Sequence, residues 1–232
     1  MRLVSWNIRD LSGDPIAVQR VLRALAADVL CLQEAPRRPG ASLRIAALAR
    51  ACGLHHVTGG RGSGGTALLV APRVHVRAAQ TVRLPVPRWY TRTRGAVLAE
   101  VSTAGTAVAL ACVHLPLTPE QRLEHARSVR SALDAWSPGP ARVVVAGDFN
   151  EPTGSPSWQV FSDLVRDPAP EAPPTFPARR PSGRIDAVLV GAGLDVLEYG
   201  DGGVDHPLVH RASDHLPVLA VLQGADLLSA GR

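Results

Sequence analysis

Short apolar runs alternate with polar turns along this chain, and the pattern predicts a protein in which strands and helices alternate. The three valines at residues 143–145 indicate a strand buried on both faces, because β-branched side chains fit a pleated surface. Similar runs predict strands at residues 2–7, 28–34, 66–71, 74–84, 94–101, 106–114, 184–190, 194–199 and 218–222.

The starts of the helices are marked by capping residues. Asp14 and Pro15 supply an N-cap and a first-turn proline to a helix whose apolar stripe begins at Ile16. The capping box T-P-E-Q at residues 118–121 starts a helix that runs to about Trp136. Two more helices are predicted at residues 43–52 and 155–164, and a proline-rich loop at residues 166–182.

Strands that alternate with helices in this way favour an α/β or α+β fold. The glycine-rich residues 59–65 lack the Gly-Lys-Ser/Thr end of a phosphate-binding P-loop and lead into a strand, so we interpret them as a hairpin turn. The chain has 232 residues, the size of one domain. We assign that domain to residues 1–222 and expect residues 223–232 to fray.

The composition is that of a globular protein, with 46% hydrophobic residues. The net charge of +5 permits a polyanionic partner. All 25 basic residues are arginines, which suit phosphate contacts, but we favour codon preference as the reason. The three cysteines lack metal-site spacing, and there is no apolar run of membrane length and no room for a signal peptide, so we expect a cytoplasmic protein without a membrane span.

The end of the valine-rich strand carries the first candidate chemistry. Gly147 allows a close approach of the backbone, and Asp148 and Asn150 would point to the same side of an extended chain. A carboxylate and an amide delivered together suggest a site for a metal-bound or phosphate-bearing ligand. The alternative is a strand that ends in an ordinary turn, since Asp, Asn and Gly are common turn residues.

Polar residues of the same few types recur at the ends of other predicted strands. They are Asn7, Glu34, His114, Asp148 with Asn150, Asp186, and Asp214 with His215. Solvation alone does not explain six separate strand ends of this kind, so we expect these side chains to converge.

These residues lie in six motifs: S-W-N-I at residues 5–8, L-Q-E at 32–34, V-H-L at 113–115, G-D-F-N at 147–150, R-I-D at 184–186 and S-D-H at 213–215. In content and order they resemble the motifs of the endonuclease/exonuclease/phosphatase superfamily, which are metal-dependent phosphoesterases that include deoxyribonuclease-I-like enzymes. The resemblance covers nearly the whole chain. It implies a four-layer sandwich in which two mixed β-sheets lie face to face with helices outside.

The resemblance also implies a metal site. Glu34 is similar to the principal Mg²⁺ ligand of the family, with Asn7 and Asp214 beside it, and Mn²⁺ is the alternative ion. Mg²⁺ prefers oxygen ligands and retains several waters, which agrees with so sparse a set. A surface salt bridge for Glu34 and a turn cap for Asn7 are the competing interpretations.

The catalytic roles implied by the resemblance fall on five residues. Asp148 is similar to the residue that orients or deprotonates the attacking water, and Asn150 to one that holds a phosphate oxygen. His215 would donate to the phosphate, and Asp186 would hold its ring and favour the imidazolium. His114 would be a second donor or general acid. His114 as a core histidine and Asp186 as a strand anchor are the competing interpretations.

The substrate is less well defined by the sequence. The segment at residues 88–94 interleaves arginines with Trp89 and Tyr90, which suits backbone contacts and base stacking, and Arg94 could contact phosphate. The first hypothesis is a phosphodiesterase or nuclease acting on DNA or RNA. The alternatives are a phosphatase or sphingomyelinase-like enzyme on a small phosphoester, and a binding module without activity. The sequence indicates no obligate protein partner.

Overall fold

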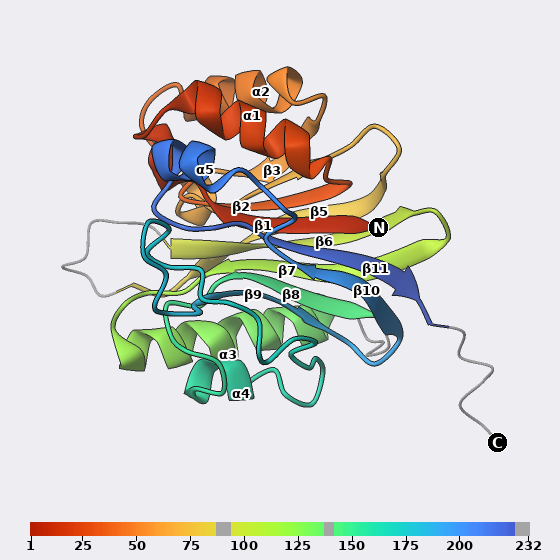
Figure 1. The fold of residues 1–232 in the computed structure, drawn as a ribbon. Helices are drawn as coiled ribbons and strands as arrows, with labels where there is room; N and C mark the ends of the chain where they lie inside the picture. The colour runs from red at the N-terminus through yellow and green to blue at the C-terminus, as the bar shows by residue number, and fades with distance from the viewer. Residues whose placement is uncertain (87–93, 137–141, 226–232) are drawn as a thin grey trace.

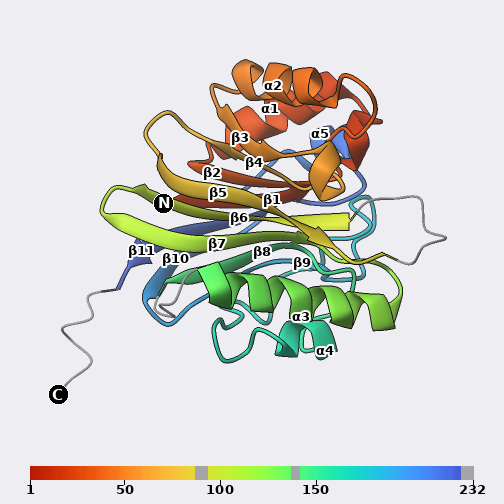
Figure 2. The same ribbon diagram turned by 180° about the vertical axis from the view of Figure 1, so that it is seen from behind.

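Two β-sheets pack face to face, and helices cover the outer face of each (Figure 1). The computed structural model describes residues 1–86, 94–136 and 142–225. Seen from behind, the same four layers are stacked in the same order, helix, sheet, sheet, helix (Figure 2). The four-layer α/β sandwich implied by the sequence motifs is therefore confirmed.

The six-stranded sheet has the order β10-β11-β1-β2-β4-β3. Its strands are β1 (Arg2–Asn7), β2 (Val29–Gln33), β3 (His55–Gly59), β4 (Ala67–Val70), β10 (Leu194–Gly200) and β11 (Val218–Gly224). β1 and β2 are parallel and the other neighbours are antiparallel, so the sheet is mixed. Helices α1 (Pro15–Leu25), α2 (Ala41–Ala51) and α5 (His206–Ala212) lie on its outer side (Figure 1).

The five-stranded sheet has the order β5-β6-β7-β8-β9. Its strands are β5 (His75–Leu84), β6 (Arg94–Thr103), β7 (Thr106–His114), β8 (Val143–Asp148) and β9 (Asp186–Val190). Only β7 and β8 are parallel among these neighbours. Helices α3 (Pro119–Trp136) and α4 (Pro156–Gln159) cover its outer side (Figure 2).

The three consecutive valines of strand β8 pack on both faces of the five-stranded sheet. Val144 belongs to the core between the sheets, whereas Val143 and Val145 pack in a second core with Val129 of α3. All three valines are buried, because successive side chains of a strand point to opposite faces and both faces are covered here. The predicted strand buried on both faces is confirmed.

Most of the predicted elements are present, with three differences. The Asp14 side chain accepts hydrogen bonds from the backbone of Ile16 and Ala17, as predicted for an N-cap. Residues 59–65 join the antiparallel strands β3 and β4 through the short 3-10 turn η2 (Arg61–Ser63), so the hairpin is confirmed. However, β3 was not predicted, α5 was expected to be a loop, and α4 is shorter than expected.

Strand β11 continues to Gly224, two residues beyond the expected end of the domain, and residues 226–232 lie outside the described part of the chain. Among the helices described, none has both the length and the apolar character required to cross a bilayer.

Candidate active site

The polar strand ends meet because of the strand directions. In the five-stranded sheet, His114 lies beside Asp148 in the parallel β7–β8 pair, and Asp186 lies beside Asp148 at the start of antiparallel β9. In the other sheet, β1 ends at Asn7 and β2 ends immediately before Glu34. The Asn7 amide Nδ2 donates to Asp148 Oδ2 across 3.1 Å, so the two sheets are joined at this point.

Gly147 allows β7 and β8 to approach each other at the site. A Cβ atom at this position would lie 2.0 Å from the carbonyl oxygen of Val113, which no side chain could tolerate. The next residues in the two strands are His114 and Asp148, and His114 Nε2 lies 3.7 Å from Asp148 Oδ2. The expected close approach of the backbone at Gly147 is therefore present.

His215 and Asp186 form a buried dyad. His215 Nδ1 lies 2.9 Å from Asp186 Oδ2, and the hydroxyl of Thr175 donates to the same oxygen across 2.6 Å. The Trp6 indole donates to the carbonyl of His215 and fixes its backbone. With Nδ1 held by Asp186, His215 directs Nε2 toward Asp148, whose Oδ2 is 3.9 Å away.

The buried charges shift the titration of the site. Burial raises the pKa of the Asp148 carboxyl to about 7, and the charge of Asp186 contributes to the rise. Burial would lower the pKa of His215, but the carboxylates around it, Asp186 first, outweigh this and raise its pKa to about 9. The pKa of His114 lies well below 6.5, because the ring is buried and the charges of Arg94 and other neighbours repel a proton.

Strained backbone surrounds these side chains. Arg9, Asp10 and Leu11 form a short turn in the left-handed region, with φ of 49°, 54° and 53°. Glu34 and Asn150 have φ of 49° and 53°. A non-glycine residue in this region costs of the order of 1–3 kcal/mol, and such residues cluster at functional sites. The strain therefore supports a functional role for this edge of the sandwich.

The position of Asn150 differs from the prediction that it follows Asp148 on an extended chain. The chain is not extended beyond Asp148, since Asn150 adopts the left-handed conformation and its backbone N–H donates to Asp148 Oδ1 across 2.9 Å. Its side-chain amide donates to the carbonyl of Leu115. The turn that was the alternative interpretation is therefore part of the candidate site, because it keeps Asn150 next to Asp148.

Two sets of side chains could hold a divalent cation. Asp148, Asp186 and His215 have ligand atoms within 4.8 Å of one another, although each also forms the hydrogen bonds described above. The set implied by the motifs offers oxygen atoms only. Glu34 is half-buried and its carboxylate has no hydrogen-bond or ion-pair partner among the described residues, so it is available as a ligand.

The other members of the oxygen set are Asn7, which pairs with Gln33 next to Glu34, and Asp214. Within the described part of the chain, Asn7 Oδ1 accepts only the backbone N–H of Arg9 and so has a second lone pair to offer. Asp214 Oδ2 lies 3.6 Å from Arg9 Nε, and neighbouring Ser213 donates to the carbonyl of Asn7. An all-oxygen set with an uncommitted carboxylate fits Mg²⁺ better than a set in which one ligand is a histidine nitrogen.

Of the three residues predicted to contact substrate, the structure describes Arg94. Trp89 and Tyr90 lie outside the described residues. Arg94 is buried at the start of β6, and its charge influences His114, so it lies near the site. Arg37, which was not predicted, acts on His114 in the same way.

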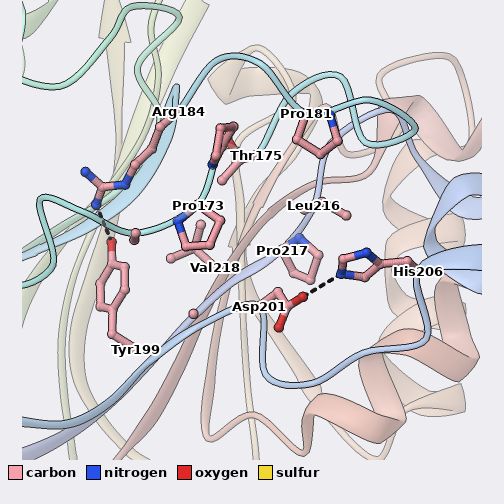
Figure 3. Close-up of a pocket in the computed structure, with 13 residues that line it drawn as sticks. Pro173, Thr175, Pro181, Arg184, Tyr199, Asp201, His206, Leu216, Pro217 and Val218 are labelled. Carbon is pink, nitrogen blue, oxygen red and sulfur yellow. Dashed lines mark hydrogen bonds and ion pairs between the residues drawn. The ribbon is translucent and has the colours of Figure 1, made fainter.

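Thr175, which donates to the dyad, is not predicted by the sequence. It lies in a proline-rich segment that predicts only a loop, and a threonine there carries no distinguishing signal. Thr175 also lines a cavity of about 330 Å³, together with Tyr199, Asp201, His206, Pro217 and other residues (Figure 3). The charged groups in Figure 3 already have partners, since Asp201 binds His206 and Arg184 binds Asp167.

Comparison with known proteins agrees with this fold. The profile of the Endonuclease/Exonuclease/phosphatase family matches residues 4–215. A comparison with curated protein sequences gave no match.

Solved structures share the fold at low sequence identity. A functionally unknown conserved protein from Enterococcus faecalis V583 is 18% identical with a TM-score of 0.79, covering 97% of this chain and 100% of its own. A mannosyl-6-phosphatase from Bacteroides thetaiotaomicron VPI-5482 is 17% identical with a TM-score of 0.77. The match covers 96% of this chain and 99% of that protein. The human Nocturnin catalytic domain with bound sulfate is 17% identical with a TM-score of 0.75. The match covers 97% of this chain and 93% of that domain.

The sandwich fold and the family match together define a phosphoester hydrolase. The chain belongs to the endonuclease/exonuclease/phosphatase family.

Proposed function

We propose that this enzyme hydrolyses a phosphodiester bond by in-line attack of a water molecule on the phosphorus atom. The observation that carries the proposal is the buried Asp148 carboxylate, which has His114 Nε2 at 3.7 Å and His215 Nε2 at 3.9 Å. A phosphoryl group bound between the two rings would meet a base and two possible donors. Asp186 holds the ring of His215, and the backbone N–H of Asn150 donates to Asp148.

Asp148 is the general base in this mechanism. Its pKa of about 7 makes Asp148 a suitable base near neutral pH, where it has both a useful ionised fraction and enough basicity to take a proton from water. Asn7 and the backbone of Asn150 each donate to one of its oxygens, which fixes the direction of the remaining lone pairs.

His215 is the cationic donor. With a pKa of about 9 it is an imidazolium at neutral pH, so Nε2 can donate to a phosphoryl oxygen that gains charge in the transition state. Asp186 keeps the other nitrogen protonated. His114 is neutral, and its Nε2, which lies 3.7 Å from Asp148 Oδ2, is the nitrogen that would bond substrate.

A divalent cation, Mg²⁺ or Mn²⁺, would be held by Glu34, Asn7 and Asp214 and would supply charge neutralisation for the phosphate and its leaving oxygen. Asn150 would keep a phosphate oxygen beside Asp148. Arg94 would add positive charge on the side of His114.

A second candidate is hydrolysis of a small phosphomonoester. It is favoured by the similarity to a protein described as a mannosyl-6-phosphatase, which shares the fold over nearly its full length. Both candidates use the same base and the same dyad, and they differ only in what surrounds the phosphate.

The proposal is tested with a substrate panel in the presence of Mg²⁺. The panel contains plasmid DNA, single-stranded DNA, RNA, bis(p-nitrophenyl) phosphate, sphingomyelin, inositol phosphates and mannose 6-phosphate. We expect the diesters to be hydrolysed, and Asp148→Asn to lower kcat about 10²–10⁴-fold, the usual contribution of a general base.

Asp195→Asn is the matched control, because Asp195 is an exposed carboxylate on the edge strand β10. Turnover of the monoesters alone would favour the second candidate. Full activity of a folded Asp148→Asn protein would refute both.

A further inference from the structure

A buried arginine near the start of α3 lies behind the site without facing the phosphate position. The Arg122 side chain is 9% exposed. Its Nη1 lies within hydrogen-bond distance of three backbone carbonyl oxygens, those of Pro116 and Leu117 at 3.0 Å and that of Asn150 at 2.7 Å, which share its two N–H groups. None of these acceptors belongs to the body of α3. One arginine thus connects two loops that are distant in sequence.

The charge of Arg122 is balanced inside the protein. Its Nε donates to Glu151 Oε2 across 2.9 Å, and Glu151 is itself buried. The second carboxylate oxygen of Glu151 accepts the backbone N–H of Ser157 at the start of α4. Glu151 follows Asn150 directly, so the ion pair holds the same loop at a second point.

Both loops carry residues of the proposed mechanism. The first leaves β7 at His114, and the second leaves β8 at Asp148. The loops already meet in front of Arg122, because the backbone N–H of Leu115 donates to the carbonyl of Asp148 at 2.9 Å and the Asn150 amide donates to that of Leu115 at 2.8 Å. Arg122 forms a second connection behind them.

We propose that Arg122 is a positioning residue, which holds the loop after His114 against the turn that contains Asp148 and Asn150. The proposal rests on the function proposed above. Asn150 is held in a left-handed conformation that is unfavourable without support, and Arg122 binds its carbonyl. A buried ion pair is by itself weak evidence for a contribution to stability, so stability alone does not account for the arrangement.

Arginine is required here because of its shape. The planar guanidinium presents donors in fixed directions to one carboxylate and three carbonyls, whereas lysine offers a compact ammonium on a flexible stem. Arg122→Lys keeps the charge near Glu151 and loses part of this geometry, so it is the informative substitution. Arg122→Leu removes the charge and leaves Glu151 unpaired.

Hydrogen exchange tests the positioning independently of hydrolysis. In Arg122→Lys we expect faster exchange at residues 115–118 and 149–152, and unchanged exchange in strands β1 and β2. Arg130→Lys is the matched control, since Arg130 lies on the same helix and pairs with the exposed Asp134 and Asp163. Equal exchange in wild type and Arg122→Lys would overturn the proposal, even if no substrate were found.

Steady-state kinetics test whether this positioning affects hydrolysis. On the substrate that wild type hydrolyses, we expect Arg122→Lys to lower kcat about 10- to 100-fold with little change in KM, because small misplacements of reacting groups are costly. Asn150→Ala and Arg122→Lys should combine to less than the product of their separate losses, since one acts through the other. A lower Tm with kcat unchanged, or fully multiplicative losses, would leave Arg122 a structural residue only.

Discussion

Thr175 illustrates how a residue without acid–base chemistry can control a catalytic dyad. Its hydroxyl donates to Asp186 Oδ2 and accepts the backbone N–H groups of Ile185 and Asp186, each at 3.3 Å. Removal of the hydroxyl takes one hydrogen bond from each of these groups, and the loss at the buried Asp186 costs about 1–3 kcal/mol. Thr175→Val should therefore lower both the free energy of unfolding and kcat, whereas Thr175→Ser should retain both.

Urea unfolding and steady-state kinetics measure the two effects in Thr175→Val. A serine variant that behaves like the valine variant would assign the effect to the methyl group and its packing, and the hydroxyl would have no role in the dyad.

His125 predicts an acid-sensitive contribution to stability. It is 1% exposed on α3, and burial lowers the pKa of its ring below 6.5. Below pH 6.5 the unfolded chain binds a proton that the folded protein resists, so stability falls as the pH decreases. The loss approaches a limit of about 1.4 kcal/mol for each pH unit between the two pKa values.

We expect His125→Gln to show a smaller loss of unfolding free energy than wild type between pH 7 and pH 5.5, measured by urea unfolding at each pH. His75→Gln, at an exposed position of β5, is the control and should follow wild type. If His125→Gln also follows wild type, the ring is not held neutral in the folded protein.

At the residue scale, the sequence indicated the groups that carry charge but not those that hold them. Asp148, Asp186 and His215 could be found because each follows or begins a β-branched run and belongs to a short motif. Thr175 and Arg122 could not, since a threonine in a proline-rich loop and an arginine on a helix are common. Their contacts arise only when loops far apart in the sequence are packed together.

At the scale of elements, the pairing of β7 with β8 depends on Gly147. An added Cβ atom would lie 2.0 Å from Val113 O and would force the two strands apart. We expect Gly147→Ala to destabilise the protein by at least about 1–3 kcal/mol, the usual cost of overpacking, and to lower activity because His114 and Asp148 would separate.

Gly62→Ala provides the control for Gly147→Ala, because a Cβ atom at Gly62 would meet nothing within 4 Å. Thermal unfolding and kcat are the measurements. Wild-type stability and activity in Gly147→Ala would mean that the close approach of the strands is not needed.

The elements that the sequence did not predict are those with the weakest periodic signal. Strand β3 is the edge of its sheet and none of its five residues is fully buried, so it lacks an alternating apolar pattern. Helix α5 has seven residues and buries only Val209 and Ala212, too few for a helical stripe. In contrast, β8 and α3 have long buried patterns or capping signals, and both were predicted almost to their ends.

At the scale of the whole molecule, the site depends on the packing of one sheet on the other. Asn7 comes from the six-stranded sheet and Asp148 from the five-stranded sheet, and their hydrogen bond crosses the interface. Because neither sheet contains a complete site, a change in their packing should alter the chemistry before it unfolds either sheet. The four-layer arrangement is thus part of the proposed mechanism as well as its support.

The two possible cation sites differ in which part of the molecule they involve, and this gives a test without a substrate. Glu34, Asn7 and Asp214 come from the neighbouring strands β2 and β1 and the residues before β11, whereas Asp186 begins β9 of the other sheet. A cation that binds only the folded protein stabilises it by about 2.7 kcal/mol at one hundred times its Kd. We therefore expect Mg²⁺ to raise the Tm of the metal-depleted wild-type protein.

The same titration on two variants decides between the sites. If the cation is held by the oxygen set, Glu34→Gln should abolish the rise in Tm and Asp186→Asn should retain it, because the second substitution leaves all three oxygen ligands intact. The opposite result would move the cation to Asp148, Asp186 and His215, where it would compete with the proton on His215. His215 could then no longer be a cationic donor to the phosphate, and the proposed roles of the dyad would have to be reassigned.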